Sequence, residues 1–226
     1  MRTAAILPVK RFVRAKQRLG LSVADPLRLD LARAMVGDVL TALRDCESIA
    51  LTIVVTSEQS VAAAAAYQGA IVVPDSAEDG QSAAAIVGLK RAIVEGVERA
   101  LCIPGDCPAL DPAELDALLS ADGEPREVVI VPDRHGTGTN GLLLRPVDAI
   151  SPSFGSGSCQ RHHELAQAAG VPCRTERPGS LLLDIDTGED LEVLRERLAG
   201  ETARAPRTRA VLGLTARRAG AAVGTR

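Results

Sequence analysis

Two aspartates late in this chain of 226 residues have the spacing of a metal site. Asp184 and Asp186 flank Ile185, so in an extended strand both carboxylates would point to the same face. Two neighbouring carboxylates repel each other unless a cation lies between them, and Mg²⁺ prefers carboxylate oxygens combined with substrate phosphates. The pattern predicts a magnesium site, with the alternative that Asp186 caps a helix beginning near Thr187.

A third carboxylate, Asp106, follows a short apolar run that ends at Ile103. Gly105 beside it would allow a ligand to approach the backbone closely. Asp106 is not needed as a helix cap, because Asp111 followed by Pro112 already has the order that begins a helix. Asp106 is therefore predicted to be a further metal ligand.

The first loop of the chain is basic and suits a polyphosphate. Before the first acid of the chain, Asp25, it contains Lys10, Arg11, Arg14, Lys16 and Arg18. The loop matches neither GxxxxGK[ST] nor GxGxxG, which disfavours a kinase or GTPase of the Walker type and a nicotinamide dehydrogenase. A solvated basic loop without a ligand is the alternative.

Two loops rich in glycine and hydroxyl groups, residues 131–141 and 154–158, are typical of anion-binding turns. Ser158 would open a helix, whose first backbone N–H groups can hold a phosphate or a carboxylate. Zinc ligands could in principle come from the set Cys159, His162, His163 and Cys173. The simpler interpretation of this segment is the first turn of a helix with exposed histidines.

The elements that must position these loops alternate between strands and helices. Apolar runs predict strands at 4–9, 49–56, 70–73, 99–104, 127–131 and 141–144, and helical spacing predicts helices at 27–43, 61–67, 81–96 and 112–120. This order predicts right-handed βαβ crossovers and a mostly parallel sheet covered on both faces. Ligands of such α/β folds bind outside the carboxyl ends of the strands, here after Val9, Val73, Ile103, Val131 and Leu183.

Composition limits the class of function. With two Phe, one Tyr and no Trp, the chain lacks the stacking surfaces of single-stranded nucleic-acid binding. No apolar run approaches the roughly 18 residues of a membrane span, and no signal-peptide pattern is present, which predicts a cytoplasmic protein. The net charge of −3 combines an acidic domain over 1–200 with a basic tail over 201–226 that is predicted to be disordered.

Several segments together resemble one enzyme family. LPVKRFVRAKQRL, GDCPAL, DRHGTGTNGLLL, FGSGS and DIDTGEDL are similar to the guanylyltransferases that activate a small phosphorylated acid in the biosynthesis of coenzyme F420. The resemblance covers about residues 3–195. It implies a single Rossmann-like α/β domain, with the three layers of the nucleotidyltransferase-A type, that uses GTP and Mg²⁺. The acceptors of the family are 2-phospho-L-lactate, phosphoenolpyruvate or 3-phospho-D-glycerate, and the GTGT and FGxxS segments favour phosphoenolpyruvate.

The resemblance also implies roles for individual residues. It makes Asp106, Asp184 and Asp186 the metal-binding acids. It places Lys10, Lys16 and Gly105 at the nucleotide. It implies that Thr139, Gly155 and Ser158 bind the acceptor, which His135 would also face. Lys10 would act in catalysis together with the first two acids. The guanine side would be residues 75–85, where Gln81 and Ser82 stand in place of the Leu-Asn that relatives often carry, so no base-reading residue is assigned.

The chemistry implied is a direct displacement. A phosphate oxygen of the acid attacks the α-phosphorus of GTP and pyrophosphate leaves, so neither a strong base nor a covalent nucleophile is needed. The alternatives are a molybdopterin or sugar-phosphate nucleotidyltransferase, which typically opens with a GxGxR signature, and a non-catalytic nucleotide-binding module. The resemblance to the guanylyltransferases suggests the downstream transferase of the pathway as a partner. The chain would be a monomer or a homodimer.

Overall fold

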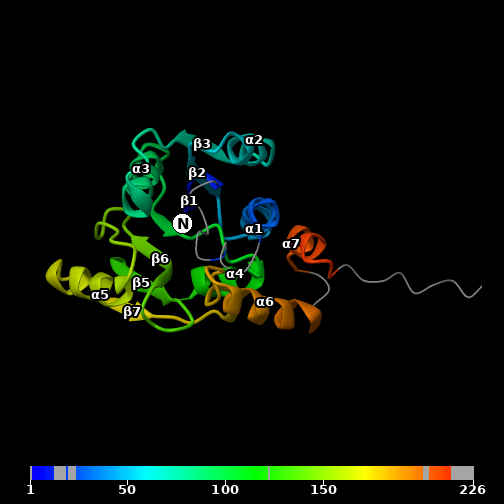
Figure 1. Ribbon diagram of the computed structural model, residues 1–226. Helices are drawn as coiled ribbons and strands as arrows, with labels where there is room; N and C mark the ends of the chain where they lie inside the picture. Colours follow the sequence, from blue (N-terminus) through cyan, green and yellow to red (C-terminus); the bar gives the residue numbers. More distant parts are fainter. Residues whose placement is uncertain (1, 13–18, 20–23, 122, 201–203, 215–226) are drawn as a thin grey trace, which may run out of the picture.

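The computed structural model describes residues 2–12, 19, 24–121, 123–200 and 204–214 (Figure 1). Within these ranges seven strands form one sheet in the order β3-β2-β1-β4-β6-β5-β7. The strands are β1 (Thr3–Val9), β2 (Leu51–Thr56), β3 (Ile71–Pro74), β4 (Arg99–Cys102), β5 (Glu127–Pro132), β6 (Thr139–Arg145) and β7 (Cys173–Thr175). The helices are α1 (Asp25–Asp45), α2 (Gln59–Tyr67), α3 (Gly80–Val94), α4 (Pro112–Ser120), α5 (Ser158–Ala168), α6 (Gly188–Gly200) and α7 (Pro206–Val211).

The predicted α/β class is confirmed, and the sheet is mostly parallel. Strands β3, β2, β1 and β4 run parallel to one another, and β7 runs parallel to β5. Strand β6 is antiparallel to both β4 and β5, because a loop of only a few residues joins β5 to β6 as a hairpin. The reversal brings the start of β6 to the same edge of the sheet as the carboxyl ends of β1 and β4.

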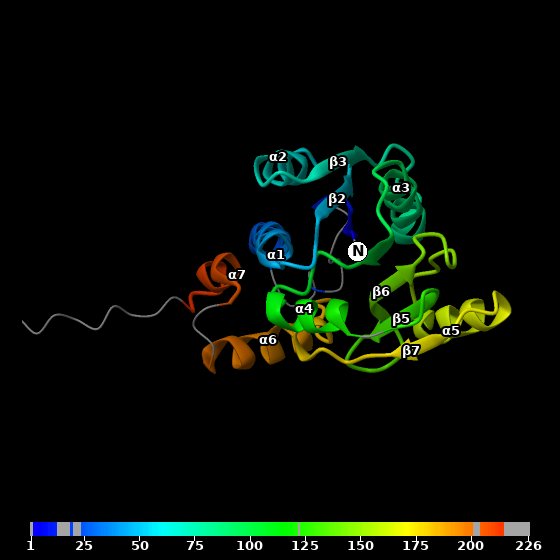
Figure 2. The ribbon, with the colours of Figure 1, turned by 180° about the vertical axis from the view of Figure 1, so that it is seen from behind.

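Alternate residues of the buried strands pack into two different layers. In β1, Leu7 and Val9 belong to a core shared with α1, α2 and α4, whereas Ala4 and Ile6 belong to a core shared with α3 and α5. Figures 1 and 2 show these helices on opposite sides of the sheet. The apolar character of both faces of β1 follows from this position between two helix layers. No helix of the described ranges is long and apolar enough to cross a membrane.

The segment that carries the two late aspartates is not the extended strand that the sequence predicts. A 3₁₀ turn occupies Gly179–Leu181, and residues 182–187 that follow lie outside any strand. The backbone N–H of Ile185 donates to the carbonyl oxygen of Asp106 at 3.1 Å. The buried Ile185 side chain packs in a third core with residues of α1 and α6. The segment is therefore held across the end of β4 by one backbone bond and an apolar anchor, without joining the sheet.

The predicted disorder beyond residue 200 is wrong for residues 204–214. Helix α7 packs on α1, and the buried Asp38 carboxylate accepts the backbone N–H groups of Arg207 at 3.1 Å and Thr208 at 2.8 Å. Ala205 and Leu212 are buried in the third core. Six helical residues are too few to give a clear apolar period, which is why the pattern was not evident. The rest of the predicted tail, residues 215–226, lies outside the described ranges.

Candidate functional site

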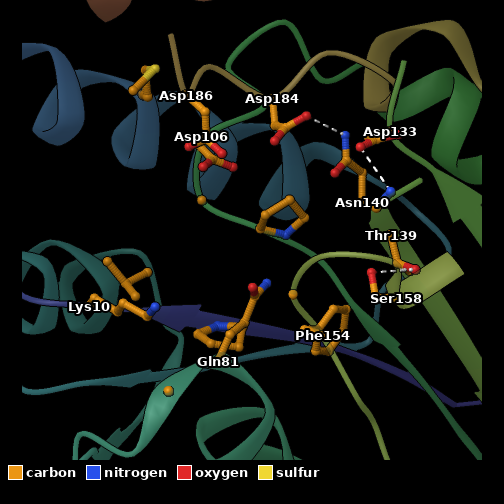
Figure 3. Close-up of a pocket in the computed structure, with 18 of the residues that line it drawn as sticks. Lys10, Gln81, Asp106, Asp133, Thr139, Asn140, Phe154, Ser158, Asp184 and Asp186 are labelled. Carbon is orange, nitrogen blue, oxygen red and sulfur yellow. Dashed lines mark hydrogen bonds between the residues drawn. The ribbon is translucent and has the colours of Figure 1, made fainter. Parts of the chain in front are cut away.

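A cavity of about 600 Å³ lies at the edge of the sheet where β1 and β4 end and β6 begins. Every predicted site residue that the structure describes lines it, namely Lys10, Gly105, Asp106, His135, Thr139, Gly155, Ser158, Asp184 and Asp186. Figure 3 shows the three acids together on one side of this cavity, with Lys10 and Gln81 across from them. The predicted Lys16 lies outside the described residues. The strand-end rule for α/β sheets predicts a ligand cavity at this edge of the sheet, and the structure has one there.

The carboxylates of Asp184 and Asp106 interact electrostatically. Burial first, and then the negative charges of Asp106 and Asp186, together raise the pKa of Asp184 to about 6, against a hydrogen bond from Asn140 that lowers it. That bond runs from Nδ2 of Asn140 to Oδ1 of Asp184 at 3.1 Å, and the same amide also donates to the carbonyl oxygen of Leu181 at 3.0 Å. Sequence reasoning missed Asn140, which fixes the position of an acid from the neighbouring loop.

This set of oxygen donors fits Mg²⁺. A buried carboxylate whose pKa is raised by neighbouring negative charges, as that of Asp184 is, gains by binding a divalent cation, and Mg²⁺ commonly takes one or two carboxylates and completes its shell with water and phosphate oxygens. Across the described ranges no group of three or more His, Cys, Asp or Glu side chains is arranged as a ready metal cage. If Mg²⁺ binds in this cavity, Asp106 and Asp184 would be its protein ligands, with Asp186 beside them.

The alternative role of Asp186 as a helix cap is wrong. Thr187 precedes α6, its hydroxyl accepts the backbone N–H of Asp190 at 3.3 Å, and Oδ2 of Asp190 accepts the backbone N–H of Thr187 at 2.8 Å. This reciprocal pair is a capping box with aspartate in the third helical position. The cap is therefore made by Thr187 and Asp190, and the carboxylate of Asp186 belongs to the lining of the cavity.

Only part of the basic loop is described, and its cations have different positions. Lys10 directly follows β1, is exposed and lines the cavity. Arg11 instead forms an ion pair with Glu78, with Nε and Oε1 2.7 Å apart, and donates to the hydroxyl of Ser57. Lys10 is therefore the described cation of this loop that can meet a bound polyphosphate.

Gly105 is explained by packing as well as by its place on the cavity. A Cβ atom there would lie 3.0 Å from Cγ2 of Val36 in α1 and 3.5 Å from Cγ2 of Val9. The absence of a side chain thus lets the loop after β4 pack tightly against α1. Close approach of the Asp106 loop to the helix is the structural consequence of this glycine.

A second part of the cavity is built from two hydroxyl groups and a glycine-rich turn. Thr139 begins β6 and Ser158 begins α5, and the Ser158 hydroxyl donates to the Thr139 hydroxyl at 3.2 Å (Figure 3). The preceding turn contains Gly155 at φ 109° and Gly157 at φ 70°, which residues with a side chain rarely adopt. The backbone N–H groups of Ser158 and Cys159 already donate to the carbonyl oxygens of Gly155 and Thr137, so the hydroxyl pair is the part of this surface suited to a phosphate or carboxylate.

Arg161 holds the turn before α5 in place. Its guanidinium donates to the carbonyl oxygens of Ser153, Phe154 and Ser156 and to the hydroxyl of Ser153. Ser82 in α3 accepts the backbone N–H of Phe154 at 2.8 Å, so the turn is also fixed to the opposite wall of the cavity. The backbone of this glycine-rich turn is thus fixed by contacts within the protein.

The predicted exposure of both histidines of α5 is wrong for His162. Its side chain is fully buried, with Nδ1 3.0 Å from the hydroxyl of Thr139. His163 points elsewhere, with its ring nitrogens close to Thr175 and to the thiol of Cys173. The zinc set that the sequence offered is therefore divided between two environments, in agreement with the lack of a metal cage among the described side chains.

The hairpin loop between β5 and β6 is held by its own carboxylate. Asp133 accepts the backbone N–H groups of Thr137 and Gly138, each at 2.9 Å. Arg134 forms ion pairs with Asp190 at 2.8 Å and Glu189 at 3.1 Å, which tie the loop to α6. His135, at the tip of the loop, is exposed and lines the cavity.

Comparison with known proteins agrees with this geometry. Residues 3–214 match the family model described as "Guanylyl transferase CofC like". A phosphoenolpyruvate guanylyltransferase of Conexibacter woesei is 48% identical over 216 residues, covering 94% of this chain and 96% of the relative. A 3-phospho-D-glycerate guanylyltransferase of Phenylobacterium zucineum is 36% identical, covering 88% of this chain and 93% of the relative.

Solved structures show the same fold at low identity. A putative nucleotide-diphospho-sugar transferase of Desulfovibrio desulfuricans superimposes with a TM-score of 0.72 at 18% identity, covering 94% of each chain. A CMP:2-keto-3-deoxy-manno-octonic acid synthetase superimposes with a TM-score of 0.62 at 14% identity, covering 89% of this chain and all of that one. From the match over nearly its whole length, the chain belongs to the CofC-like guanylyl transferase family and is a nucleotidyltransferase.

Proposed function

We propose that this guanylyltransferase couples GTP to phosphoenolpyruvate and releases pyrophosphate, in the biosynthesis of coenzyme F420. The observation that carries the proposal is the division of one cavity into an acidic side, with Asp106 and Asp184, and an anion-binding side, with Thr139 and Ser158. The name of the Conexibacter woesei relative, at 48% identity, supports phosphoenolpyruvate as the acid. The product would pass to the downstream transferase of the pathway in the cytoplasm.

The reaction brings two polyanions together, so charge is the main obstacle. Mg²⁺ bound at Asp106 and Asp184 would neutralise phosphate charge and orient the nucleotide. The ammonium group of Lys10, on the opposite side of the cavity, would add a positive charge near the triphosphate. The phosphate oxygen of the acid is already anionic at neutral pH, which makes a general base unnecessary.

The other residues of the cavity orient the acid. The Thr139 and Ser158 hydroxyls would bind its phosphate or carboxylate. Arg161 and Ser82 keep this surface rigid, and Asn140 keeps Asp184 in place. Preorganised positions of this kind lower the barrier because little reorganisation remains when the reactants meet.

A panel of acceptors tests the proposal. Pyrophosphate release is measured with GTP and Mg²⁺ and, in separate reactions, phosphoenolpyruvate, 3-phospho-D-glycerate and 2-phospho-L-lactate. We expect phosphoenolpyruvate to give the highest kcat/KM. The relative of Phenylobacterium zucineum makes 3-phospho-D-glycerate the second candidate. A preference for that acid would replace the proposed acceptor, and turnover only with a sugar phosphate or a pterin would contradict the proposal as a whole.

A further inference from the structure

His162 makes a hydrogen bond that fixes the position of its ring proton. Nε2 accepts the backbone N–H of Ser153 at 2.9 Å. A backbone N–H can only donate, so Nε2 carries no proton and the neutral ring is protonated on Nδ1. Burial, together with the positive charge of Arg161, lowers the pKa of His162 to about 4, which keeps the ring neutral at physiological pH.

The Nδ1 proton has one partner in the described structure, the hydroxyl of Thr139, 3.0 Å away. The hydroxyl of Ser158 donates to the same oxygen at 3.2 Å. A hydroxyl oxygen has two lone pairs, so these two bonds use its full accepting capacity. Its own proton must then be donated to another group, and Thr139 faces the cavity.

The conclusion does not depend on the direction of the bond between the two hydroxyls. If Thr139 donates to Ser158 instead, the Ser158 proton takes the outward position, and Ser158 also lines the cavity. In both arrangements Nδ1–H of His162 donates to the Thr139 hydroxyl, so one of the two hydroxyl protons is left to point outward. The pair therefore presents a donor, rather than a lone pair, to whatever occupies this side of the cavity.

We propose that His162 is a positioning residue for the acceptor acid, because its Nδ1–H directs a hydroxyl proton of the Thr139–Ser158 pair toward the phosphate or carboxylate of that acid. The inference rests on the proposed function for the identity of the acid. An anion requires donors, and a pair free to reverse would present a lone pair to it part of the time. His162 does not touch the acid and acts through Thr139.

Two substitutions separate this role from a purely structural one. In His162→Asn the side-chain amide nitrogen can replace Nδ1 and still donate to Thr139, whereas in His162→Gln the amide oxygen can replace Nε2 and still accept from Ser153. We expect the KM for phosphoenolpyruvate to rise about 10- to 100-fold in His162→Gln, the scale of a lost hydrogen bond to a charged group. We expect it to rise only about threefold in His162→Asn, with the KM for GTP unchanged in both variants.

A second substitution tests the coupling. In a Thr139→Val background the additional effect of His162→Gln on the KM for the acid should disappear, because the partner that it positions is absent. An equal rise of KM in the Gln and Asn variants, or a parallel rise of the KM for GTP, would overturn the inference. Nitrogen-15 NMR of the unsubstituted protein, which needs no variant to fold, should show a neutral ring protonated on Nδ1, and a proton on Nε2 would overturn it as well.

Different results would contradict the role of His162 and the proposed function. If the unsubstituted protein turns over phosphoenolpyruvate but His162→Gln behaves like His162→Asn, the inference is wrong and the function stands. If no acid is turned over, inorganic phosphate serves as the probe, with its binding followed by phosphorus-31 line broadening. Weaker binding of inorganic phosphate by His162→Gln than by His162→Asn would support the inference, and equal binding would overturn it.

Discussion

Turnover of GTP with phosphoenolpyruvate is expected to fall by at least about two orders of magnitude in Asp106→Asn, the scale seen when one charge-stabilising group is removed. Asp106 lines the cavity and its charge acts on Asp184, so the substitution removes one of the two acids proposed to bind Mg²⁺. The amide has nearly the shape of the carboxylate, so the fold should remain. Initial rates of pyrophosphate release at saturating Mg²⁺ measure the effect.

Asp111→Asn is the matched control. Asp111 follows in the same loop but caps α4, where its Oδ1 accepts the backbone N–H of Ala113 at 3.0 Å, and it does not line the cavity. Asparagine is an equally good cap, so turnover should remain close to that of the unsubstituted protein. A rate for Asp106→Asn within about tenfold of the unsubstituted protein, with an unchanged melting temperature, would remove Asp106 from the mechanism.

Asp184→Asn is expected to stabilise the metal-free protein at pH 8 while it lowers turnover by at least about 100-fold. The folded-state pKa of Asp184 is raised from 3.8 to about 6, so the ionised carboxylate costs folding energy at every pH above this range. A neutral side chain removes that cost, which gives a gain of about 1–3 kcal/mol in the free energy of unfolding at pH 8. Asn140 can still donate to the amide oxygen of the new side chain.

The gain in stability of Asp184→Asn depends on pH. Below the unfolded pKa of 3.8 the carboxyl is protonated in both states, so the advantage of Asp184→Asn should shrink as the pH falls from 6 toward 4. Urea unfolding in EDTA at several pH values measures it. Asp186→Asn is the control, because this exposed neighbour should change stability by no more than about 0.5 kcal/mol. An Asp184→Asn variant less stable than the unsubstituted protein at pH 8 would contradict the argument.

The positions of the main site residues could be predicted because they follow buried strands. Lys10 and Asp106 come directly after β1 and β4, whose apolar residues mark them as central strands of a sheet. The carboxyl ends of such strands meet at one edge, so the site follows from local pattern alone. The same reasoning predicts that Asp184 lies near this edge, but it wrongly predicts an extended strand around it. A hydrophobic run such as 181–183 can be buried without joining a sheet.

Residues that act through other side chains could not be predicted in this way. Asn140 and His162 owe their roles to the antiparallel β6 and to the turn before α5, which set them against Asp184 and Thr139. Their sequence neighbours contain no signal for these contacts, because a buried histidine and an exposed one have the same local pattern. Helix α7 was missed for a related reason, since its cap, Asp38, lies on α1, far away in the sequence.

The most direct test of the central claim follows the phosphate of the acid. GTP, Mg²⁺ and phosphoenolpyruvate labelled with oxygen-18 in the three non-bridging phosphate oxygens are incubated with the protein, and the products are analysed by mass spectrometry. The account predicts a guanosine diphospho-acid that retains all three labels, together with unlabelled pyrophosphate, because a phosphate oxygen of the acid attacks the α-phosphorus of GTP. Labelled pyrophosphate, or GMP in place of the coupled product, would contradict it.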